Sequence, residues 1–220
     1  MRIGILASGG GSNLQAIINH FAASPARDAA QVVLVASNRP EAGAMSCAQL
    51  AGIATHHIAN ADNGQSLLDA LRTAGVELLA LAGYLKLVPR VVVDAYAGHM
   101  LNVHPALLPS FGGHGMYGLR VHEAVIQAGA KLSGVTVHFV SAEYDRGAIA
   151  AQWPVAVLRT DTPQSLAARV LAVEHRLYPV VLEAVAGRTL TLGTDGRTHG
   201  GLPAHSAFAM NDAKPFFSLH

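Results

Sequence analysis

The segment that runs from Leu101 to Pro109 combines residue types that can catalyse acyl transfer. Asn102 and His104 stand two residues apart at the end of an apolar run, and Pro105 and Pro109 then force the chain out of that run. Residues i and i+2 of a strand point to the same face, so the two side chains can reach one reacting atom. An amide and an imidazole placed in this way can polarise a carbonyl and stabilise the oxyanion that forms when it is attacked.

A carboxylate that can complete this site follows further along the chain. Asp145 stands before Arg146 and Gly147 in a predicted turn between two strands. From there it would orient His104 and favour its charged form. The chain has no Gly-x-Ser-x-Gly elbow, and Ser110 stands in a loop without special context. We therefore expect one substrate to attack another directly, without a serine nucleophile.

A glycine-rich loop from Ser8 to Asn13 follows the first apolar run and opens the first predicted helix. Glycines let the backbone approach a ligand, and a helix N-terminus offers free N–H groups to an anion. The loop therefore favours a phosphate site. A tight strand–helix turn capped by Ser12 is the alternative interpretation of the same residues.

This region lacks the motifs of dinucleotide-binding and nucleoside-triphosphate-binding proteins, which narrows the kinds of phosphate compound that it could bind. The dinucleotide fingerprint needs a third glycine where Leu14 stands, and no acidic residue ends the second apolar run, where Ser37, Asn38 and Arg39 follow. NAD is therefore disfavoured, and Arg39 leaves only an NADP site as an alternative. The Lys-Ser/Thr pair of the Walker motif is also missing, so a phosphorylated small molecule fits best.

Most of the 12 histidines are expected to be structural. His138 is one member of an alternating strand, and His104 taken singly would also be more typical of a hydrogen-bonded structural residue. No pair of histidines has the i, i+4 spacing of a helical metal site. We therefore expect no metal, although a His–Asp metal site stays open as an alternative.

The composition narrows the class of partner. The chain has 220 residues, of which 51% are hydrophobic and 13% charged, and a net charge of +1. It can bury a full core, and bulk charge gives no indication of a nucleic-acid or membrane partner. The first apolar run, from Ile3 to Ala7, is too short for a signal peptide, and no run approaches the roughly 18 residues that span a bilayer. Cys47 is the only cysteine and predicts a small buried residue, in a reducing, cytoplasmic setting.

Short apolar runs alternate with helix-like segments over residues 1–100. Such runs are typical of strands that crossover helices bury on both faces. The pattern predicts an α/β fold with a doubly wound, mostly parallel sheet. The predicted strands are residues 2–7, 32–37, 55–58, 78–82 and 100–104, and the predicted helices are residues 12–23, 41–51, 65–74 and 89–95.

The second half of the chain has a different pattern. A predicted helix over residues 118–128 is followed by strands over 135–140 and 149–157, whose short connection predicts an antiparallel pair. Asp161 or Thr162 would cap a long helix that runs to about residue 186, and residues 189–192 could form a last strand. Residues 193–220 have no clear period and predict a mobile or surface-wrapped tail, with Phe216 and Phe217 as candidate anchors.

These motifs occur in the order and spacing of a known family. The chain resembles the phosphoribosylglycinamide formyltransferases, folate-dependent enzymes of purine synthesis, from Met1 to about Ala186. The resemblance is carried by Ile5 to Gln15, Ser37 to Pro40, Leu81 to Tyr84, Asn102 to Pro109, Val137 to Val140, and Asp145. It implies the formyltransferase fold as a single domain over residues 1–192, followed by the tail. Residues 1–100 would be a nucleotide-phosphate half, and residues 101–192 a catalytic and folate half.

The resemblance also implies a role for each matching residue. Asn102, His104 and Asp145 match the family's catalytic trio. The loop that binds the substrate phosphate is matched by Gly11, Ser12 and Asn13, and a residue that contacts the ribose is matched by Glu174. The lining of the pterin pocket is matched by Leu85, Lys86, Leu87 and Val88, and the loop that hydrogen-bonds the pterin by Ser141, Ala142, Glu143, Tyr144 and Asp145.

The implied reaction transfers the formyl group of 10-formyltetrahydrofolate to the amine of glycinamide ribonucleotide. The amine attacks directly, protonated His104 and the Asn102 amide stabilise the oxyanion, and Asp145 keeps His104 charged. No metal is implied, and the partners are small molecules rather than nucleic acid or membrane. A monomer and a homodimer both stay open.

Other classes share parts of this pattern. Methionyl-tRNA formyltransferase would need a further C-terminal domain, and formyltetrahydrofolate deformylase a further N-terminal one, and we expect neither here. A non-catalytic binding protein on the same fold is a rival against which the intact trio argues. The glycine-rich stretch over residues 111–118 is longer than is usual in the family, which fits either a lid or a neutral insertion.

Overall fold

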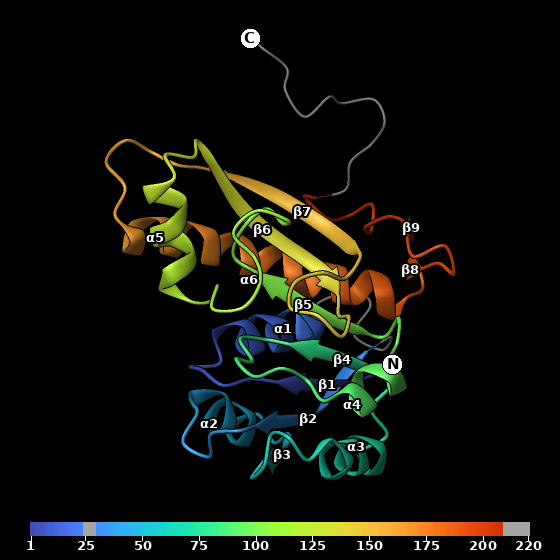
Figure 1. The fold of residues 1–220 in the computed structure, drawn as a ribbon. Coiled ribbons are helices and arrows are strands. Elements are labelled where there is room, and N and C mark those ends of the chain that lie inside the picture. The colour runs from blue at the N-terminus through green and yellow to red at the C-terminus, as the bar shows by residue number, and fades with distance from the viewer. Residues whose placement is uncertain (24–29, 209–220) are drawn as a thin grey trace.

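A computed structural model of the chain shows a seven-stranded sheet with helices on both faces (Figure 1). It describes residues 1–23 and 30–208. The strands lie in the order β3-β2-β1-β4-β5-β6-β7. Their bounds are β1 (Arg2–Leu6), β2 (Gln31–Ser37), β3 (Ala54–His57), β4 (Leu78–Leu81), β5 (Met100–His104), β6 (Leu132–Phe139) and β7 (Ile149–Ala156).

The sheet changes direction at β5. Strands β1 to β5 are parallel to their neighbours, whereas β6 is antiparallel to β5, and β7 is antiparallel to β6. This arrangement confirms the predicted fold class. Strand β6 begins at Leu132, before the predicted start at residue 135, because its first residues pair with β7 although Ser133 and Gly134 do not extend the apolar pattern.

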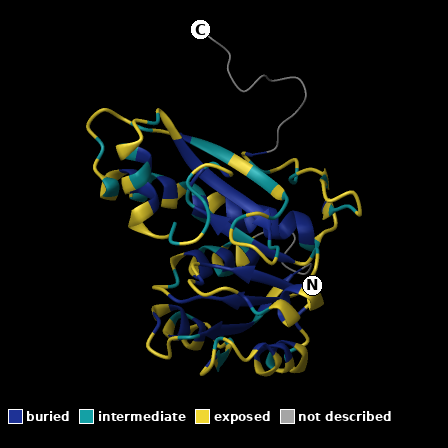
Figure 2. Cartoon of the chain, viewed as in Figure 1, coloured by how far each residue is buried: buried dark blue, intermediate teal, exposed yellow. Residues whose placement is uncertain are grey.

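The helices divide between the two faces of the sheet. They are α1 (Ser12–Ala23), α2 (Gly43–Leu50), α3 (Gly64–Thr73), α4 (Arg90–Ala95), α5 (Leu119–Gln127) and α6 (Pro163–Ala186). One buried apolar cluster joins the sheet to α1, α2, α5 and α6, and a second joins it to α3 and α4. Figure 2 shows strands β1, β2, β4 and β5 as a mostly buried layer between helices with exposed outer faces, whereas no residue of the edge strand β3 is buried.

Helix α6 is held against the sheet by hydrogen bonds from one of its side chains. Thr162 is its N-cap and accepts a hydrogen bond from the Ser165 N–H, which decides between the two predicted caps. The hydroxyl of Tyr178, fully buried in this helix, lies 3.1 Å from the Leu81 carbonyl oxygen and 3.0 Å from that of Leu101. These contacts tie α6 to the last residue of β4 and the second residue of β5. One turn earlier, Glu174 is therefore held on the same face of the helix, over the sheet.

The described part of the C-terminal segment is folded against the body. Strand β8 (Leu190–Leu192) confirms the predicted last strand, and it pairs with β9 (Thr198–Gly200), which was not predicted. Phe208 is buried, and its ring lies 4.7 Å from that of Trp153 on β7. Residues 193–208 thus follow the surface-wrapped alternative, whereas Phe216 and Phe217 lie outside the described residues.

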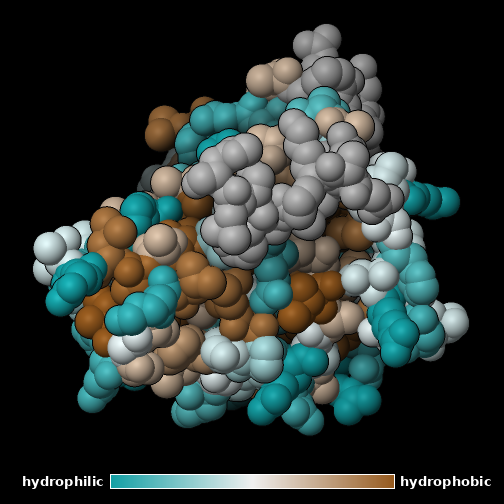
Figure 3. Space-filling model, turned by 90° about the horizontal axis from the view of Figure 1, so that it is seen from above, coloured by the Kyte–Doolittle hydropathy of each residue, from teal (hydrophilic) through white to brown (hydrophobic). Residues whose placement is uncertain are grey.

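The β6–β7 end of the sheet has an apolar outer surface. Leu132 and Leu158, near the ends of these strands, are 50% and 53% exposed. Figure 3 looks onto this end of the molecule and shows brown surface beside the grey residues. Strand β7 is an edge strand that contains Pro154, and proline cannot donate a backbone hydrogen bond to a further strand.

Within the described residues, none of the helices combines the length and the apolar character that crossing a membrane requires.

Candidate active site

A cavity of about 790 Å³ lies where the parallel strands of the sheet end. Open α/β sheets bind ligands at the carboxyl ends of their strands, at the point where the strand order reverses. Here the order reverses between β1 and β4. The cavity is lined by residues that follow β4 and β5, by the loop between β5 and α5, by the loop between β6 and β7, and by one face of α6.

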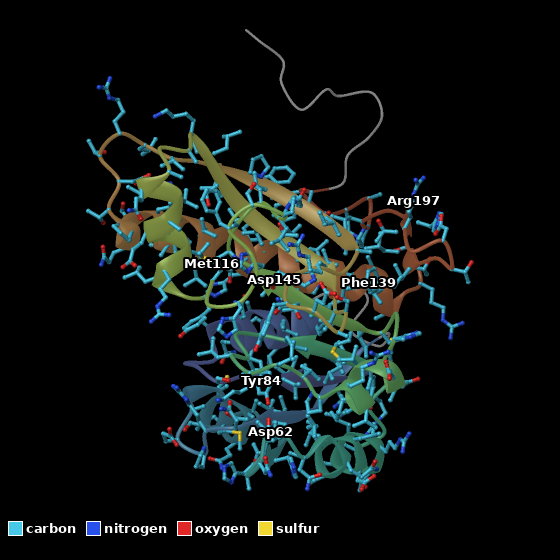
Figure 4. All side chains as sticks on the ribbon, viewed as in Figure 1. Asp62, Tyr84, Met116, Phe139, Asp145 and Arg197 are labelled. Carbon is cyan, nitrogen blue, oxygen red and sulfur yellow. The ribbon has the colours of Figure 1, made fainter. Side chains whose placement is uncertain are left out.

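The predicted trio is brought together at this cavity. The Asp145 Oδ2 atom lies 3.6 Å from His104 Nδ1, and Asp145 Oδ1 lies 3.5 Å from the Asn102 amide nitrogen. His104 is 3% exposed and Asp145 lines the cavity from the β6–β7 loop. Figure 4 labels Asp145 and, on the facing loop, Met116, which lines the same cavity. The structure therefore joins two segments that are far apart in the sequence.

His138 belongs to the same cluster, which the sequence interpretation missed. It is a strand residue, as predicted, but its Nε2 atom lies 3.1 Å from the Asn102 amide nitrogen and 3.6 Å from Asp145 Oδ1. The cause is the antiparallel pairing of β5 and β6, which sets His138 directly opposite Asn102. Its Nδ1 atom donates to the Phe139 carbonyl oxygen at 3.0 Å, so Nε2 is the nitrogen that faces the site.

The electrostatics of His104 differ from the expectation that Asp145 keeps it charged. Burial lowers the pKa of His104, and this effect outweighs the opposite effects of the Asp145 carboxylate and of the Phe111 carbonyl. The folded chain thus holds His104 as a mostly neutral imidazole near neutral pH. Burial raises the pKa of Asp145, but the neighbouring His138 and His104 and the hydrogen bond from the Gly113 N–H lower it overall, so this group is a carboxylate.

The loop after β5 closes over the trio. The Nε2 atom of His104 lies 2.8 Å from the Phe111 carbonyl oxygen, and the Gly113 N–H donates to Asp145 Oδ2 at 2.8 Å. Gly112 is packed so closely that a Cβ atom on it would stand 2.4 Å from a methyl carbon of Leu108 and 3.2 Å from the Asp145 Cβ atom. Phe111 and Asp145 both have left-handed backbone, with φ of 56° and 54°. Such conformations in residues other than glycine cluster at functional sites.

The glycine-rich loop after β1 is divided between two surfaces. Gly11 has φ of +87°, and a Cβ atom there would stand 2.8 Å from the Ala44 backbone, so only glycine fits. Asn13 lines the cavity, and its amide nitrogen donates to Glu174 Oε2 at 2.8 Å. Burial raises the pKa of Glu174, whereas the Asn13 hydrogen bond lowers it. Ser12 instead lines a neighbouring groove with His175 and Arg176, and Gly11 lines neither.

The segments predicted to hold the folate form the other end of the cavity. Its lining includes Leu85, Lys86, Leu87, Val88, Ser141, Glu143 and Tyr144, but not Ala142. Leu85 and Leu87 are 39% and 47% exposed, and their apolar side chains in the cavity lining suit an apolar ligand. The rings of His114 and Tyr144 lie 5.8 Å apart and join the loop after β5 to the β6–β7 loop.

Several cavity residues were not predicted as part of the site. They are Tyr84, Met116, Tyr117, Arg120 and His122, together with Arg39, which had been considered only for NADP. The helix pattern gave no signal for Arg120 and His122, because a polar residue on a helix is usually solvated. Among residues 1–23 and 30–208, no group of three or more His, Cys, Asp and Glu side chains is arranged to hold a metal ion.

Proteins of known function with similar sequences include formyltransferases. The formyl transferase family model matches residues 1–182. A phosphoribosylglycinamide formyltransferase of Arabidopsis thaliana, named as chloroplastic, is 42% identical over 202 residues, which are 89% of this chain and 68% of that protein. The enzyme of the same name from Escherichia coli is 35% identical over 198 residues, which cover 87% of this chain and 90% of its own.

Solved structures give the same picture, although some relatives are much longer. The crystal structure of phosphoribosylglycinamide formyltransferase from Anaplasma phagocytophilum has a TM-score of 0.83 and 35% identity, and the match covers 94% of this chain and 97% of that one. The chain spans 64% of a Vigna unguiculata relative and 20% of the trifunctional purine biosynthetic protein adenosine-3 of Gallus gallus. The chain therefore belongs to the formyl transferase family, and within it to the phosphoribosylglycinamide formyltransferases.

Proposed function

We propose that this chain transfers the formyl group of 10-formyltetrahydrofolate to the amine of glycinamide ribonucleotide in purine biosynthesis. The observation that carries the proposal is one cavity in which Asn102, His104 and Asp145 stand between two binding regions. Asn13 and Glu174 form the region for the nucleotide, and the segments over residues 85–88 and 141–144 form the region for the folate. The names of the relatives supply the substrate class.

The reaction needs only groups that stand in this cavity. The amine nitrogen forms a bond to the formyl carbon, and the carbonyl electron pair moves to the formyl oxygen. When the intermediate collapses, the bond from the formyl carbon to N10 of the folate breaks. The amine loses one proton and N10 gains one, so the products are formylglycinamide ribonucleotide and tetrahydrofolate. Asp145, ionised and partly solvent-accessible, is the group that can carry this proton.

His104 and Asn102 stabilise the negative oxygen of the intermediate. In the structure, His104 Nε2 donates a hydrogen bond to the Phe111 carbonyl oxygen, while Nδ1 faces Asp145. We infer that the formyl oxygen takes the place of the Phe111 carbonyl as the acceptor. Its developing charge raises the pKa that burial had lowered, so His104 can take from Asp145 the proton that the amine releases, be cationic while the oxyanion exists, and return this proton for transfer to N10. The loop over residues 111–118 must then shift when both substrates are bound.

The remaining site assignments are part of the same proposal. The backbone of the loop over Gly11, Ser12 and Asn13 would hold the substrate phosphate, and Arg39, which lines the large cavity together with Asn13, is a cation within this region. Glu174 would accept hydrogen bonds from the ribose. Ala142, which does not line the cavity, would contribute through its backbone or only as a spacer. The cytoplasmic location and the oligomeric state stay predictions.

The test is an assay of the purified chain with glycinamide ribonucleotide and 10-formyltetrahydrofolate. We expect a formylated nucleotide and tetrahydrofolate in equal amounts, with activity lost in His104→Ala and Asn102→Ala. Formate released at the same rate without the nucleotide would instead show a folate deformylase. Binding of both ligands without any product would show a binding protein on this fold.

A further inference from the structure

Tyr84 carries a hydrogen-bond donor that the folded chain leaves unused. It follows Gly83 at the end of β4 and lines the large cavity, yet only 8% of it is exposed. Its hydroxyl oxygen is closed to solvent and has no hydrogen-bond partner among the described residues. A buried hydroxyl without a partner is unfavourable, and in a native protein such a group calls for an explanation.

The ring and the hydroxyl of Tyr84 are held by different surroundings. The ring packs in the apolar cluster on the α3–α4 face of the sheet, with residues such as Val88 and Val92. The Asp62 carboxylate and the Tyr144 phenol are electrostatic neighbours of the hydroxyl. Figure 4 shows Tyr84 and Asp62 below Asp145. Burial, with these two groups, raises the pKa of Tyr84 to about 12. The phenol therefore keeps its proton and can only donate or accept as a neutral group.

The neighbours of Tyr84 indicate which ligand it serves. Leu85 follows it directly, Val88 packs in the same cluster, and Tyr144 comes from the β6–β7 loop. All three belong to the segments that the proposed function gives to the folate, whereas Asn13 and Glu174 hold each other at the nucleotide end. Resting on that function, we propose that the Tyr84 hydroxyl donates a hydrogen bond to a neutral polar acceptor of the folate cosubstrate.

The proposal predicts different effects of Tyr84→Phe on the stability of the chain and on its binding of the folate. The substitution removes one oxygen atom that has no partner in the free protein, so the melting temperature should stay the same or rise. The KM for 10-formyltetrahydrofolate should rise about two- to tenfold, the effect of losing one neutral hydrogen bond. The contact is the same before and during reaction, so kcat and the KM for glycinamide ribonucleotide should hardly change.

Tyr96→Phe is the matched control from the same apolar cluster. Tyr96 is equally buried, but its hydroxyl donates to the Val76 carbonyl oxygen at 3.1 Å, and it does not line the cavity. Its removal should lower the melting temperature by about 2–4 °C and leave both KM values unchanged. The two variants thus predict opposite patterns.

The affinity for tetrahydrofolate, measured by calorimetry, tests the role of Tyr84 without depending on catalysis. We expect the Kd of Tyr84→Phe to rise by the same factor as its KM. An unchanged Kd and KM for the folate, or a fall in melting temperature like that of Tyr96→Phe, would overturn the inference and make the hydroxyl structural. If the parent chain binds tetrahydrofolate but forms no product, the proposed function fails while the role of Tyr84 can still be measured.

Discussion

Asp145 makes contacts with His104, Asn102, His138 and the Gly113 N–H at the same time. Asp145→Asn keeps its shape and removes its charge, so the imidazole of His104 loses the group that favours its cationic form. We expect kcat to fall at least about a hundredfold, the scale of lost oxyanion stabilisation, while both KM values change much less. Steady-state kinetics measure this.

Asp94→Asn is the control for Asp145→Asn. Asp94 pairs with Arg90 on the exposed face of α4 and does not line the cavity, so the same chemical change there should leave kcat unaltered. If Asp145→Asn keeps kcat within a few-fold of the parent, His104 does not depend on this carboxylate.

A second prediction concerns the protonation state of His104. Burial lowers its pKa below the ordinary value of about 6.5, and Asp145 opposes that shift. Titration followed by NMR of the ring should therefore find His104 neutral at pH 7 in the free chain. In Asp145→Asn the pKa should fall further, because only the opposing effect has been removed. A value that rises in the variant would mean that the carboxylate does not favour the charged form.

Asn13 tests the nucleotide end of the cavity. Asn13→Ala would remove an amide that touches Glu174 and whose oxygen is buried without a partner. Nucleotide affinity should weaken by roughly 1.5–3 kcal/mol, the range for hydrogen bonds to charged groups, and folate affinity should not. Asn19→Ala, on the exposed face of the same helix, is the control. A loss of folate affinity instead would reverse the two ends of the cavity.

At the scale of single residues, the sequence predicts the trio but not the whole cluster. Asn102, His104 and Asp145 have types and spacing that carry chemistry by themselves, and the structure brings them together. His138 and Tyr84 give no such signal, because an alternating strand and an aromatic residue after a strand are common in any core. Only the pairing of β5 with β6 and the shape of the cavity show what these two side chains face.

Among the elements, the C-terminal segment carries the clearest prediction. Phe208 is 6% exposed, packs on Trp153, and lies under the guanidinium of Arg176. Phe208→Ala should lower the free energy of unfolding by about 3 kcal/mol, as for other buried aromatic residues, and leave kcat unchanged. Leu50→Ala, at a side chain that is 91% exposed, should have almost no effect. Denaturant unfolding is the measurement, and equal stabilities would show that the segment does not hold to the core.

The predicted elements match the structure best where periodicity and caps agree. Residues 12–23 form α1 with the predicted bounds, and α6 begins and ends as expected because Thr162, Pro163 and Gly187 mark its ends. Strand β9 was not predicted, since Thr198 to Gly200 is too short and polar to show a period. Its pairing with β8 depends on a turn whose position no local pattern reveals.

For the molecule as a whole, we predict a reaction that needs no metal. The polarising groups proposed here are an amide and an imidazole from the chain itself. Dialysis against a chelator should leave the rate of formyl transfer unchanged within error, and added divalent ions should not raise it. Loss of activity in chelator that one metal restores would contradict the mechanism, provided that the fold, followed by circular dichroism, is retained.

The change from parallel to antiparallel strands at β5 also determines which part of the site can change during evolution. Asn102, His138 and Asp145 come from two adjacent strands and the loop that follows the second one, so the reacting centre belongs to the second half of the chain. The nucleotide end is built from distant pieces, the loop after β1 and helix α6. Mutations can therefore accumulate at the acceptor end without disturbing the chemistry. A lineage with this architecture can exchange the amine that it formylates while inheriting its donor and its catalytic step unchanged.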